Sequence, residues 1–151
     1  RFGKYHEDEF WANDIYQMDI KVVTIPECLY CYRQRGDSIM GKKNIARDFD
    51  IVEALQERIY IYLQQQGYND QAYKVMIFSL EYLEESKRLV SNEREKARFV
   101  RAEQITKDII RQLEKRKLPI VQKLSLLFIE INPCLIFSVG IRFRKILERF
   151  L

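Results

Sequence analysis

Residues 44–67, with the sequence NIARDFDIVEALQERIYIYLQQQG, decide the fold class of this chain. Apolar residues recur in this stretch every three or four positions, which is the spacing of one face of an α-helix. These residues are Ile45, Phe49, Val52, Leu55, Ile59 and Leu63. The pattern stops at Gly67, a residue type suited to a left-handed C-terminal cap. The stretch therefore predicts one long helix.

Two further helices are predicted after it. Asn69 is expected to cap the second, whose apolar residues continue to about Leu89. Asn92, followed three positions later by Glu95, resembles a capping box, and an apolar stripe up to Leu113 then indicates a third helix. Long helices with short connections pack antiparallel to one another. We therefore expect a three-helix extension over residues 44–118.

Composition agrees with a helical protein. The chain has 151 residues, of which 47% are hydrophobic and only five are Gly and three Pro. This hydrophobic content excludes a disordered chain, and the scarcity of turn residues favours long regular elements. The net charge of +4 does not by itself indicate nucleic-acid binding. The basic stretch 87–117 has few aromatic residues on which bases could stack, so no nucleic-acid partner is predicted.

The first 43 residues have a different pattern. Residues 8–18 predict a short helix that opens on the carboxylates Glu7, Asp8 and Glu9. Residues 20–25 and 28–33 are rich in β-formers on either side of Pro26, which predicts two short strands. The expected fold class is thus mainly α with a small β part.

The cysteines indicate a reducing, cytoplasmic setting, because three Cys in a chain of this length do not form a disulfide framework. Cys28 and Cys31 form a C-x-x-C pair, but neither a second pair nor a nearby His completes a zinc site. We interpret both as ordinary buried thiols, and no metal ligand is predicted in this chain.

Residues 119–151 combine an apolar stretch with a basic amphipathic end. Glu130, Asn132 and Pro133 interrupt the apolar stretch, which argues against a membrane-spanning helix. Arg142, Lys145 and their neighbours alternate with Phe and Leu, as in helices that lie on anionic membrane surfaces. Two core helices with a solvated basic face are an equally weighted alternative.

Three segments of residues 1–43, in this order, carry a family resemblance. They are YHEDEFW at 5–11, IKVVTI at 20–25 and PECLYCYRQRGDSI at 26–39. Together they resemble the closing part of the catalytic domain of glycosyltransferase family 2. The resemblance implies a GT-A α/β fold, of which residues 1–43 are the C-terminal remnant, and transfer of a sugar with inversion from a nucleotide-sugar donor to a growing polysaccharide or glycan acceptor.

The resemblance also implies roles for individual residues. Asp8 matches the general base, which takes a proton from the acceptor hydroxyl. Glu7, His6 and Trp11 are expected to orient the acceptor, with the Trp ring as a stacking surface. The bottom-up alternatives are a helix cap for Asp8, a core position for Trp11 and a hydrogen-bonded His6.

Arg33, Arg35 and Ser38 are expected to hold the departing diphosphate, since guanidinium groups bind such anions in a bidentate manner. The alternative for both Arg is a solvated loop. The family also uses a divalent metal, Mg or Mn, bound through an Asp-x-Asp motif in an N-terminal half that residues 1–151 do not supply. Asp48-Phe49-Asp50 has these letters, but it lies in a helical pattern, and we interpret it as a chance match.

On this interpretation the chain is part of a larger transferase, inactive alone, cytoplasmic and able to associate with membranes through residues 119–151. The fragment is also expected to self-associate through residues 1–35, because unpaired strands and apolar faces need a partner. The rival hypothesis is a non-enzymatic helical module that binds a partner protein or a membrane surface.

Overall fold

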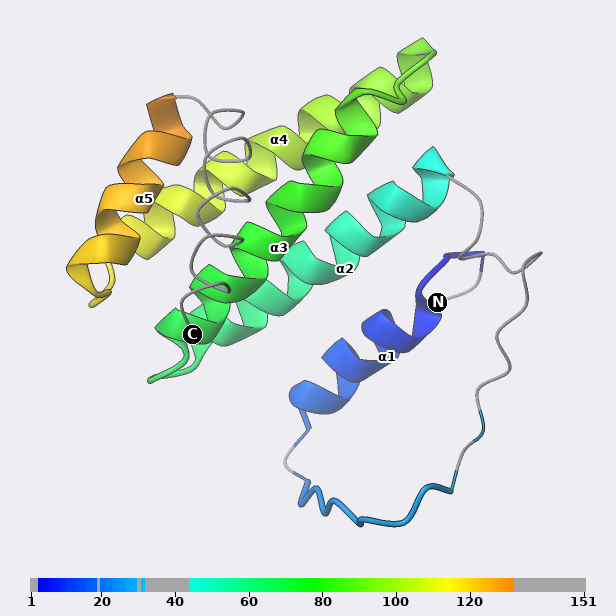
Figure 1. Cartoon of the computed structure of the whole chain (residues 1–151), viewed down its shortest axis with the longest axis vertical. Helices are drawn as coiled ribbons and strands as arrows, with labels where there is room; N and C mark the ends of the chain where they lie inside the picture. The colour runs from blue at the N-terminus through cyan, green and yellow to red at the C-terminus, as the bar shows by residue number, and fades with distance from the viewer. Residues whose placement is uncertain (1–2, 19, 30, 32–43, 132–151) are drawn as a thin grey trace, which may run out of the picture.

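The computed structural model describes residues 3–18, 20–29, 31 and 44–131, and its regular elements are helices (Figure 1). These are α1 (Glu7–Tyr16), α2 (Ile45–Gln64), α3 (Asn69–Lys87), α4 (Glu93–Glu114) and α5 (Ile120–Ile131). Each of α3, α4 and α5 runs antiparallel to the helix before it (Figure 1). The predicted mainly α class and the antiparallel arrangement of the three long helices are confirmed.

A local sequence signal explains where α2 begins. The Asn44 side chain accepts hydrogen bonds from the backbone N–H groups of Ala46 and Arg47, at 3.0 and 3.5 Å. These bonds satisfy N–H groups that have no partner within the first turn of a helix. The helix ends at Gln64, and its C-cap residue, Gln65, has an extended backbone, so the left-handed cap predicted at Gly67 is wrong. The φ of +89° at Gly67 belongs to the turn that follows α2.

The two other predicted caps have different outcomes. The Asn92 side chain accepts a hydrogen bond from the N–H of Glu95 at 3.0 Å, and the Glu95 carboxylate accepts one from the N–H of Ser91 at 2.8 Å. The predicted capping box is therefore confirmed, except that the carboxylate binds the N–H of Ser91 and not that of Asn92. The prediction for Asn69 is wrong. The chain enters α3 at Asn69 itself, so its side chain is already inside the helix, and the capping position falls on Tyr68.

The core lies between α2, α3, α4 and α5. Its buried residues include Ile59 of α2, Met76 of α3, Ile109 of α4 and Leu126 of α5. All four are fully enclosed. Burying side chains of this size contributes about 1.5 to 3 kcal/mol each, so this shared core holds the four helices together.

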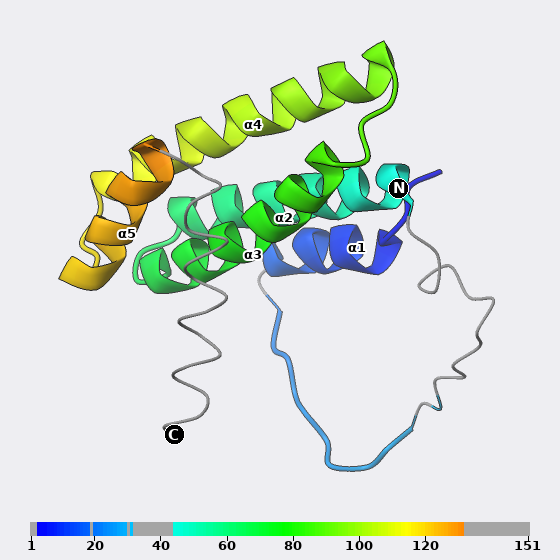
Figure 2. The same cartoon turned by 45° about the horizontal axis from the view of Figure 1, so that its top comes forward.

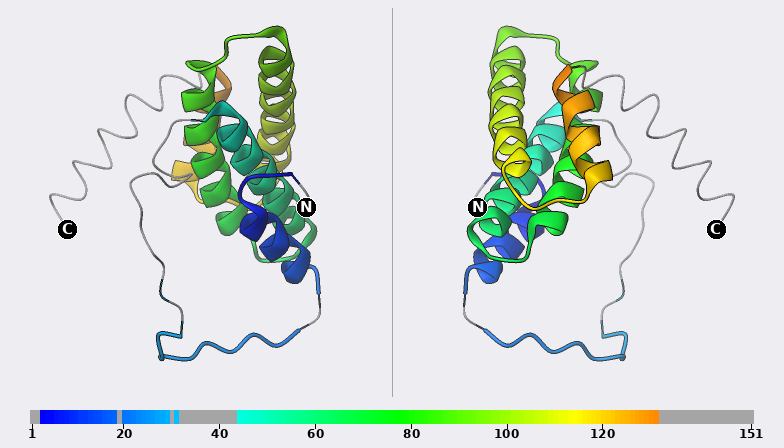
Figure 3. Two further views of the ribbon diagram at one scale, coloured as in Figure 1. Left: turned by 90° about the vertical axis from the view of Figure 1, so that its right-hand side faces the viewer. Right: turned by 90° about the vertical axis from the view of Figure 1, so that its left-hand side faces the viewer.

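Helix α1 packs on the outer side of α2 and runs in the same direction (Figures 1 and 2). Its buried residues are Phe10 and Asn13, and the Asn13 side-chain amide donates to the backbone carbonyl of Ala54 at 2.7 Å. Helix α5 lies at another edge of the bundle, beside α4 (Figure 3). The two ends of the described chain thus attach to different parts of one helical body.

The predicted β part is the main correction to the fold. Residues 20–29 and 31 contain no strand, and a bend occurs at Pro26 and Glu27. Strand propensity is realised only where a neighbouring strand accepts the backbone hydrogen bonds, and the described residues offer no such neighbour. The prediction of buried thiols is also wrong, because Cys28 and Cys31 lie on this segment and are exposed.

The structure describes only part of the C-terminal segment 119–151 for which helices were predicted. Residues 120–131 form α5, whereas 132–151, with the basic amphipathic end, lie outside the described residues. Within the described part of the chain, none of the helices combines the length and the apolar character needed to cross a bilayer.

Candidate functional site

The predicted catalytic and acceptor-orienting residues lie at the start of α1. Asp8 is exposed in the first turn, and its carboxylate accepts a hydrogen bond from the N–H of Glu9 at 3.0 Å. Glu7 is also exposed. Trp11 is one helical turn after Asp8, and 66% of its surface is exposed, which excludes the core position considered from the sequence. Asp8 and Trp11 therefore share an accessible face of α1.

Helix α1 is held rigidly from its other face. The Arg58 guanidinium contacts the Glu9 carboxylate at 2.7 Å and donates to the side-chain oxygen of Asn13 at 2.9 Å. The same group lies 5.3 Å from the centre of the Tyr16 ring, within range of a cation–π interaction. Since these contacts involve residues along the whole helix, they fix the direction in which Asp8 and Trp11 point.

His6 has an unusual conformation immediately before α1. Its φ of +56° lies in the left-handed region, which is costly for a residue with a Cβ atom. The His6 carbonyl accepts from the N–H groups of Glu9 and Phe10, at 3.1 and 3.3 Å. Within the described residues its Nε2 atom is enclosed and has no hydrogen-bond partner. The expected contact of His6 with an acceptor is not tested by this arrangement.

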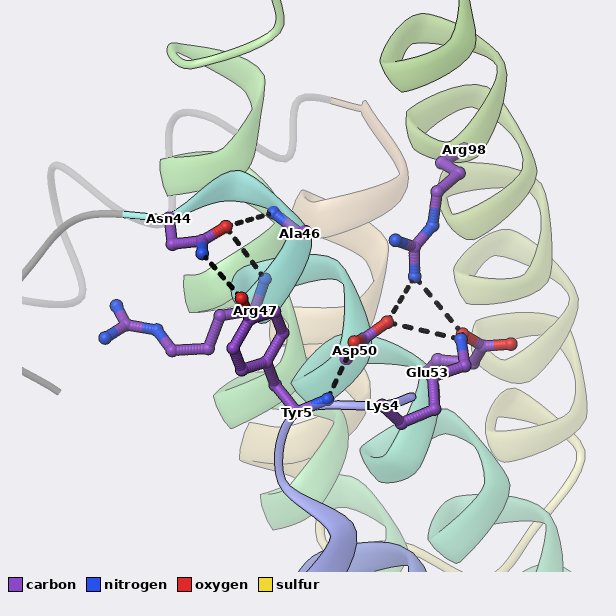
Figure 4. A network of polar contacts seen from close by, with 8 residues as sticks. All are labelled: Lys4, Tyr5, Asn44, Ala46, Arg47, Asp50, Glu53 and Arg98. Atoms are coloured by element: carbon purple, nitrogen blue, oxygen red, sulfur yellow. Dashed lines mark hydrogen bonds and ion pairs between the residues drawn. The ribbon is translucent and has the colours of Figure 1, made fainter. Parts of the chain in front are cut away.

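An ionic cluster that the sequence did not reveal ties the N-terminal segment to α2 and α4 (Figure 4). Asp50 contacts Arg98 at 2.7 Å and Lys4 at 3.2 Å, and it accepts from the backbone N–H of Tyr5 at 3.0 Å. Glu53 contacts the same two cations, Lys4 at 2.6 Å and Arg98 at 3.3 Å. We call Lys4, Asp50, Glu53 and Arg98 the ionic cluster.

Electrostatics keep Asp50 ionised although its side chain is only 5% exposed. Burial acts to raise the pKa of this carboxyl group, but the hydrogen bonds from Arg98, Tyr5 and Lys4 outweigh it and lower the pKa below its usual value. The sequence did indicate that Asp50 needs a partner, because an Asp between Phe49 and Ile51 lies at a buried helix position. It did not indicate which residues are the partners of Asp50, since Lys4 and Arg98 are far from it along the chain.

A cleft of about 280 Å³ opens beside the ionic cluster, between α2 and α4. Its walls include Phe49, Gln56 and Tyr60 from α2 and Arg98 and Arg101 from α4. The Arg98 guanidinium lies 5.0 Å from the centre of the Phe49 ring, so this cation is already engaged on two sides. The cleft carries charges of both signs, since Glu53 and Glu57 also line it, and it does not select one class of ligand.

The remaining predicted site residues are not brought together by the described structure. Arg33, Arg35 and Ser38 lie outside the described residues. The described part of the chain holds no group of three or more His, Cys, Asp or Glu arranged to bind a metal ion. The Asp-x-Asp sequence at residues 48–50 lies within α2, where Asp48 is paired with Arg47 and Asp50 belongs to the ionic cluster. These carboxylates therefore do not fit a metal site.

Comparisons with known proteins identify no relative of this chain. No protein-family model matches it, and no similar protein was found among curated proteins or among solved structures.

Proposed function

We propose that this chain is the C-terminal part of an inverting glycosyltransferase, with Asp8 as its general base. The observation that carries the proposal is the pairing of an accessible carboxylate with an accessible indole, one turn apart at the start of α1. A base must reach the proton that it removes, and sugar rings stack on aromatic faces. The resemblance of residues 5–11 and 20–39 to glycosyltransferase family 2 supplies the reaction.

In the proposed reaction the Asp8 carboxylate takes the proton of an acceptor hydroxyl as its oxygen attacks the anomeric carbon of the donor sugar. The bond to the nucleoside diphosphate breaks on the opposite face, so the configuration at that carbon inverts. Arg58 and Asn13 hold α1 against α2, which keeps the base at a fixed place relative to the bundle. Glu7, exposed in the same turn, is available to orient the acceptor.

The developing charge on the diphosphate needs cationic partners. By resemblance, Arg33, Arg35 and Ser38 take this role in the proposal. The family's divalent metal belongs, by the same resemblance, to a part of the enzyme that residues 1–151 do not supply.

Exposed apolar side chains continue from Trp11 into the next segment, which supports the proposed remnant of a larger domain. Val22, Val23 and Leu29 are each at least three-quarters exposed. Such a patch on a protein surface is typical of a contact with another protein part. In the proposal the rest of the catalytic domain covers it, and the 151-residue chain alone self-associates through it, which light scattering detects as a species heavier than a monomer.

The experiment uses the full-length protein and a panel of nucleotide sugars, with release of nucleoside diphosphate as the readout. We expect one donor to be consumed faster when a glycan acceptor is added, and NMR of the product to show an inverted anomeric configuration. A retained configuration, or no release with any donor, would contradict the proposal.

A pair of variants tests the role of the indole. Trp11→Ala is expected to raise the KM for the acceptor, because the stacking surface is lost, with the KM for the donor unchanged. Trp11→Phe keeps an aromatic face and is the matched control, so it is expected to stay close to the unchanged protein. Equal acceptor KM values for both variants would argue against stacking at this position.

The rival function, a helical module at a membrane surface, is favoured by the exposed apolar side chains of α5.

A further inference from the structure

The outer face of α5 is an apolar stripe that no described part of the chain covers. Ile120 and Val121 are 77% and 78% exposed, and Leu124 and Leu127 are both about half exposed. Positions 120, 124 and 127 follow one another at helical spacing, and 121 lies beside 124. We call Ile120, Val121, Leu124 and Leu127 the outer stripe.

Contacts on the opposite face prevent α5 from turning this stripe inward. Leu126 and Ile129 are buried in the shared core. On the same side, the Gln122 amide donates to the Asp70 carboxylate at 2.6 Å, and Ser125 shares a hydrogen bond of 2.5 Å with the Tyr73 hydroxyl. Rotating α5 to bury the outer stripe would expose the two core residues and break both polar bonds. The exposure of the stripe is thus a stable property of the packed bundle.

Three lysines lie next to the outer stripe in the chain, and we call them its bordering lysines. Lys115 and Lys117 lie in the turn that leads into α5, and Lys123 lies on α5 at the edge of the stripe. All three are exposed, and within the described residues none of them is in an ion pair. Arg116, between the first two, is also exposed and donates to the carbonyl of Leu63 at 2.8 Å.

We infer that the outer stripe of α5 and its bordering lysines form a docking surface for an anionic lipid bilayer. An apolar stripe bordered by cations is the pattern of a helix that lies in the membrane interface. The apolar side chains enter the boundary of the acyl region, while the lysines reach the lipid phosphates.

The one-sided exposure of α5 fits an interfacial position. Over residues 120–131 the outer stripe lies on one side of the helix, while Leu126 and Ile129 on the other side are buried in the shared core. Helix α5 lies at the edge of the bundle (Figure 3), and the outer stripe is exposed there.

Charge favours a bilayer over a second copy of the chain as the occupant. In a symmetric dimer the same patch meets itself. Such a contact would bring Lys115, Lys117 and Lys123 of both copies to one interface, where like charges repel. A surface of anionic headgroups instead complements them. This inference does not depend on the proposed transferase activity, and its test measures no transfer.

The test is co-sedimentation of the 151-residue chain with vesicles of phosphatidylcholine, with and without about 30% phosphatidylserine, at about 0.1 M salt. We expect binding to the vesicles that contain phosphatidylserine and little binding to the neutral ones. Equal binding to both vesicle types, or to neither, would overturn the inference.

Two matched pairs of variants locate the surface. Leu124→Glu on the stripe is expected to abolish binding, whereas Val100→Glu on α4 is expected to leave it unchanged, although the two residues are 52% and 55% exposed. The double variant Lys115→Gln/Lys117→Gln is expected to weaken binding about 25-fold, that is, about fivefold for each lysine. Its control, Lys96→Gln/Lys107→Gln, has the same net charge and is expected to bind like the unchanged chain.

Circular dichroism shows whether each variant is folded, and all these substitutions are at exposed positions. Equal loss of binding in a variant and its control would assign the effect to overall charge or folding and overturn the inference. Unchanged binding of Leu124→Glu would place the membrane contact elsewhere in the chain. A dimer that Leu124→Glu dissociates, without vesicle binding by the unchanged chain, would make a second copy the occupant.

Discussion

Replacing Asp50 with Asn tests whether the ionic cluster fastens the N-terminal segment to the bundle. The Asp50 carboxylate accepts hydrogen bonds from Arg98 at 2.7 Å, from the Tyr5 backbone at 3.0 Å and from Lys4 at 3.2 Å. Asn has nearly the same size but one acceptor oxygen and no charge. Arg98 and Lys4 both donate to Oδ1 of Asp50, whereas the Tyr5 N–H donates to Oδ2. An Asn oxygen in the place of Oδ1 therefore keeps two of the three bonds, now without a negative charge, and turns the amide N–H₂ group toward the Tyr5 N–H.

The contacts of Asp50 determine how much the free energy of unfolding is expected to fall in Asp50→Asn. A hydrogen bond to a charged group contributes about 1.5 to 3 kcal/mol when it is shielded from solvent. Here the Lys4 and Arg98 side chains are 32% and 35% exposed, and both keep Glu53 as a partner, so screening reduces the loss. We expect the free energy of unfolding to fall by about 2 kcal/mol, which for a chain of this size corresponds to a Tm lower by about 4 to 8 °C.

The assay is urea unfolding followed by far-UV circular dichroism, with Glu53→Gln as the matched control. Glu53 contacts the same two cations, but its side chain is 50% exposed, so its loss is expected to cost less than about 1 kcal/mol. The reasoning fails if Glu53→Gln destabilises the chain as much as Asp50→Asn does, because burial then does not determine the strength of these contacts.

Further predictions concern pH, the turn after α2 and two surface sites. Because folding lowers the pKa of Asp50, its contribution is fully present above the unfolded value of 3.8 and is lost as pH falls through the folded pKa, so the stability difference between the unchanged chain and Asp50→Asn is expected to shrink in acid. Gly67→Ala is expected to cost about 1 kcal/mol, because φ is +89°. Gly67→Asn, which tolerates this conformation better, is expected to cost less in the same urea assay; equal losses would exclude a backbone cause. Trp11 is the single Trp of the sequence, so acrylamide is expected to quench the chain's indole fluorescence strongly, and weak quenching would mean that the residue is covered. Cys28 and Cys31 are expected to react with a thiol reagent without denaturant; reaction only in urea would contradict their exposure.

The long helices were predictable because their signals are local. In α2 the apolar spacing identified the buried face, and Gly67 identified the turn that follows the helix, although the helix itself ends at Gln64. Asn92 and Glu95 are only three residues apart, so their capping interaction was readable without knowledge of the rest of the fold. The prediction from the capping signal of Asn69 was wrong by one residue, because α3 already begins at Asn69 and the capping position is Tyr68.

Features that depend on distant partners were not predictable. The β-formers of residues 20–25 and 28–33 predicted strands, but a strand requires a neighbour that the described residues do not provide. The ionic cluster joins Lys4, Asp50 and Arg98, and neither periodicity nor capping relates positions so far apart. For the candidate site, the sequence predicted the helix that carries Asp8, whereas its attachment through Arg58 was visible only in the structure.

The turnover of the Asp8→Asn variant tests the central claim most directly. The measurement compares kcat for sugar transfer by the full-length protein with that of Asp8→Asn and of Asp14→Asn, a control on the same helix, together with donor affinity by calorimetry. General-base catalysis contributes about 10²- to 10⁴-fold, so we expect kcat of Asp8→Asn to fall by at least that lower factor with donor affinity unchanged, and Asp14→Asn to stay close to the unchanged enzyme. An unchanged kcat in Asp8→Asn would contradict the assignment of Asp8 as the base.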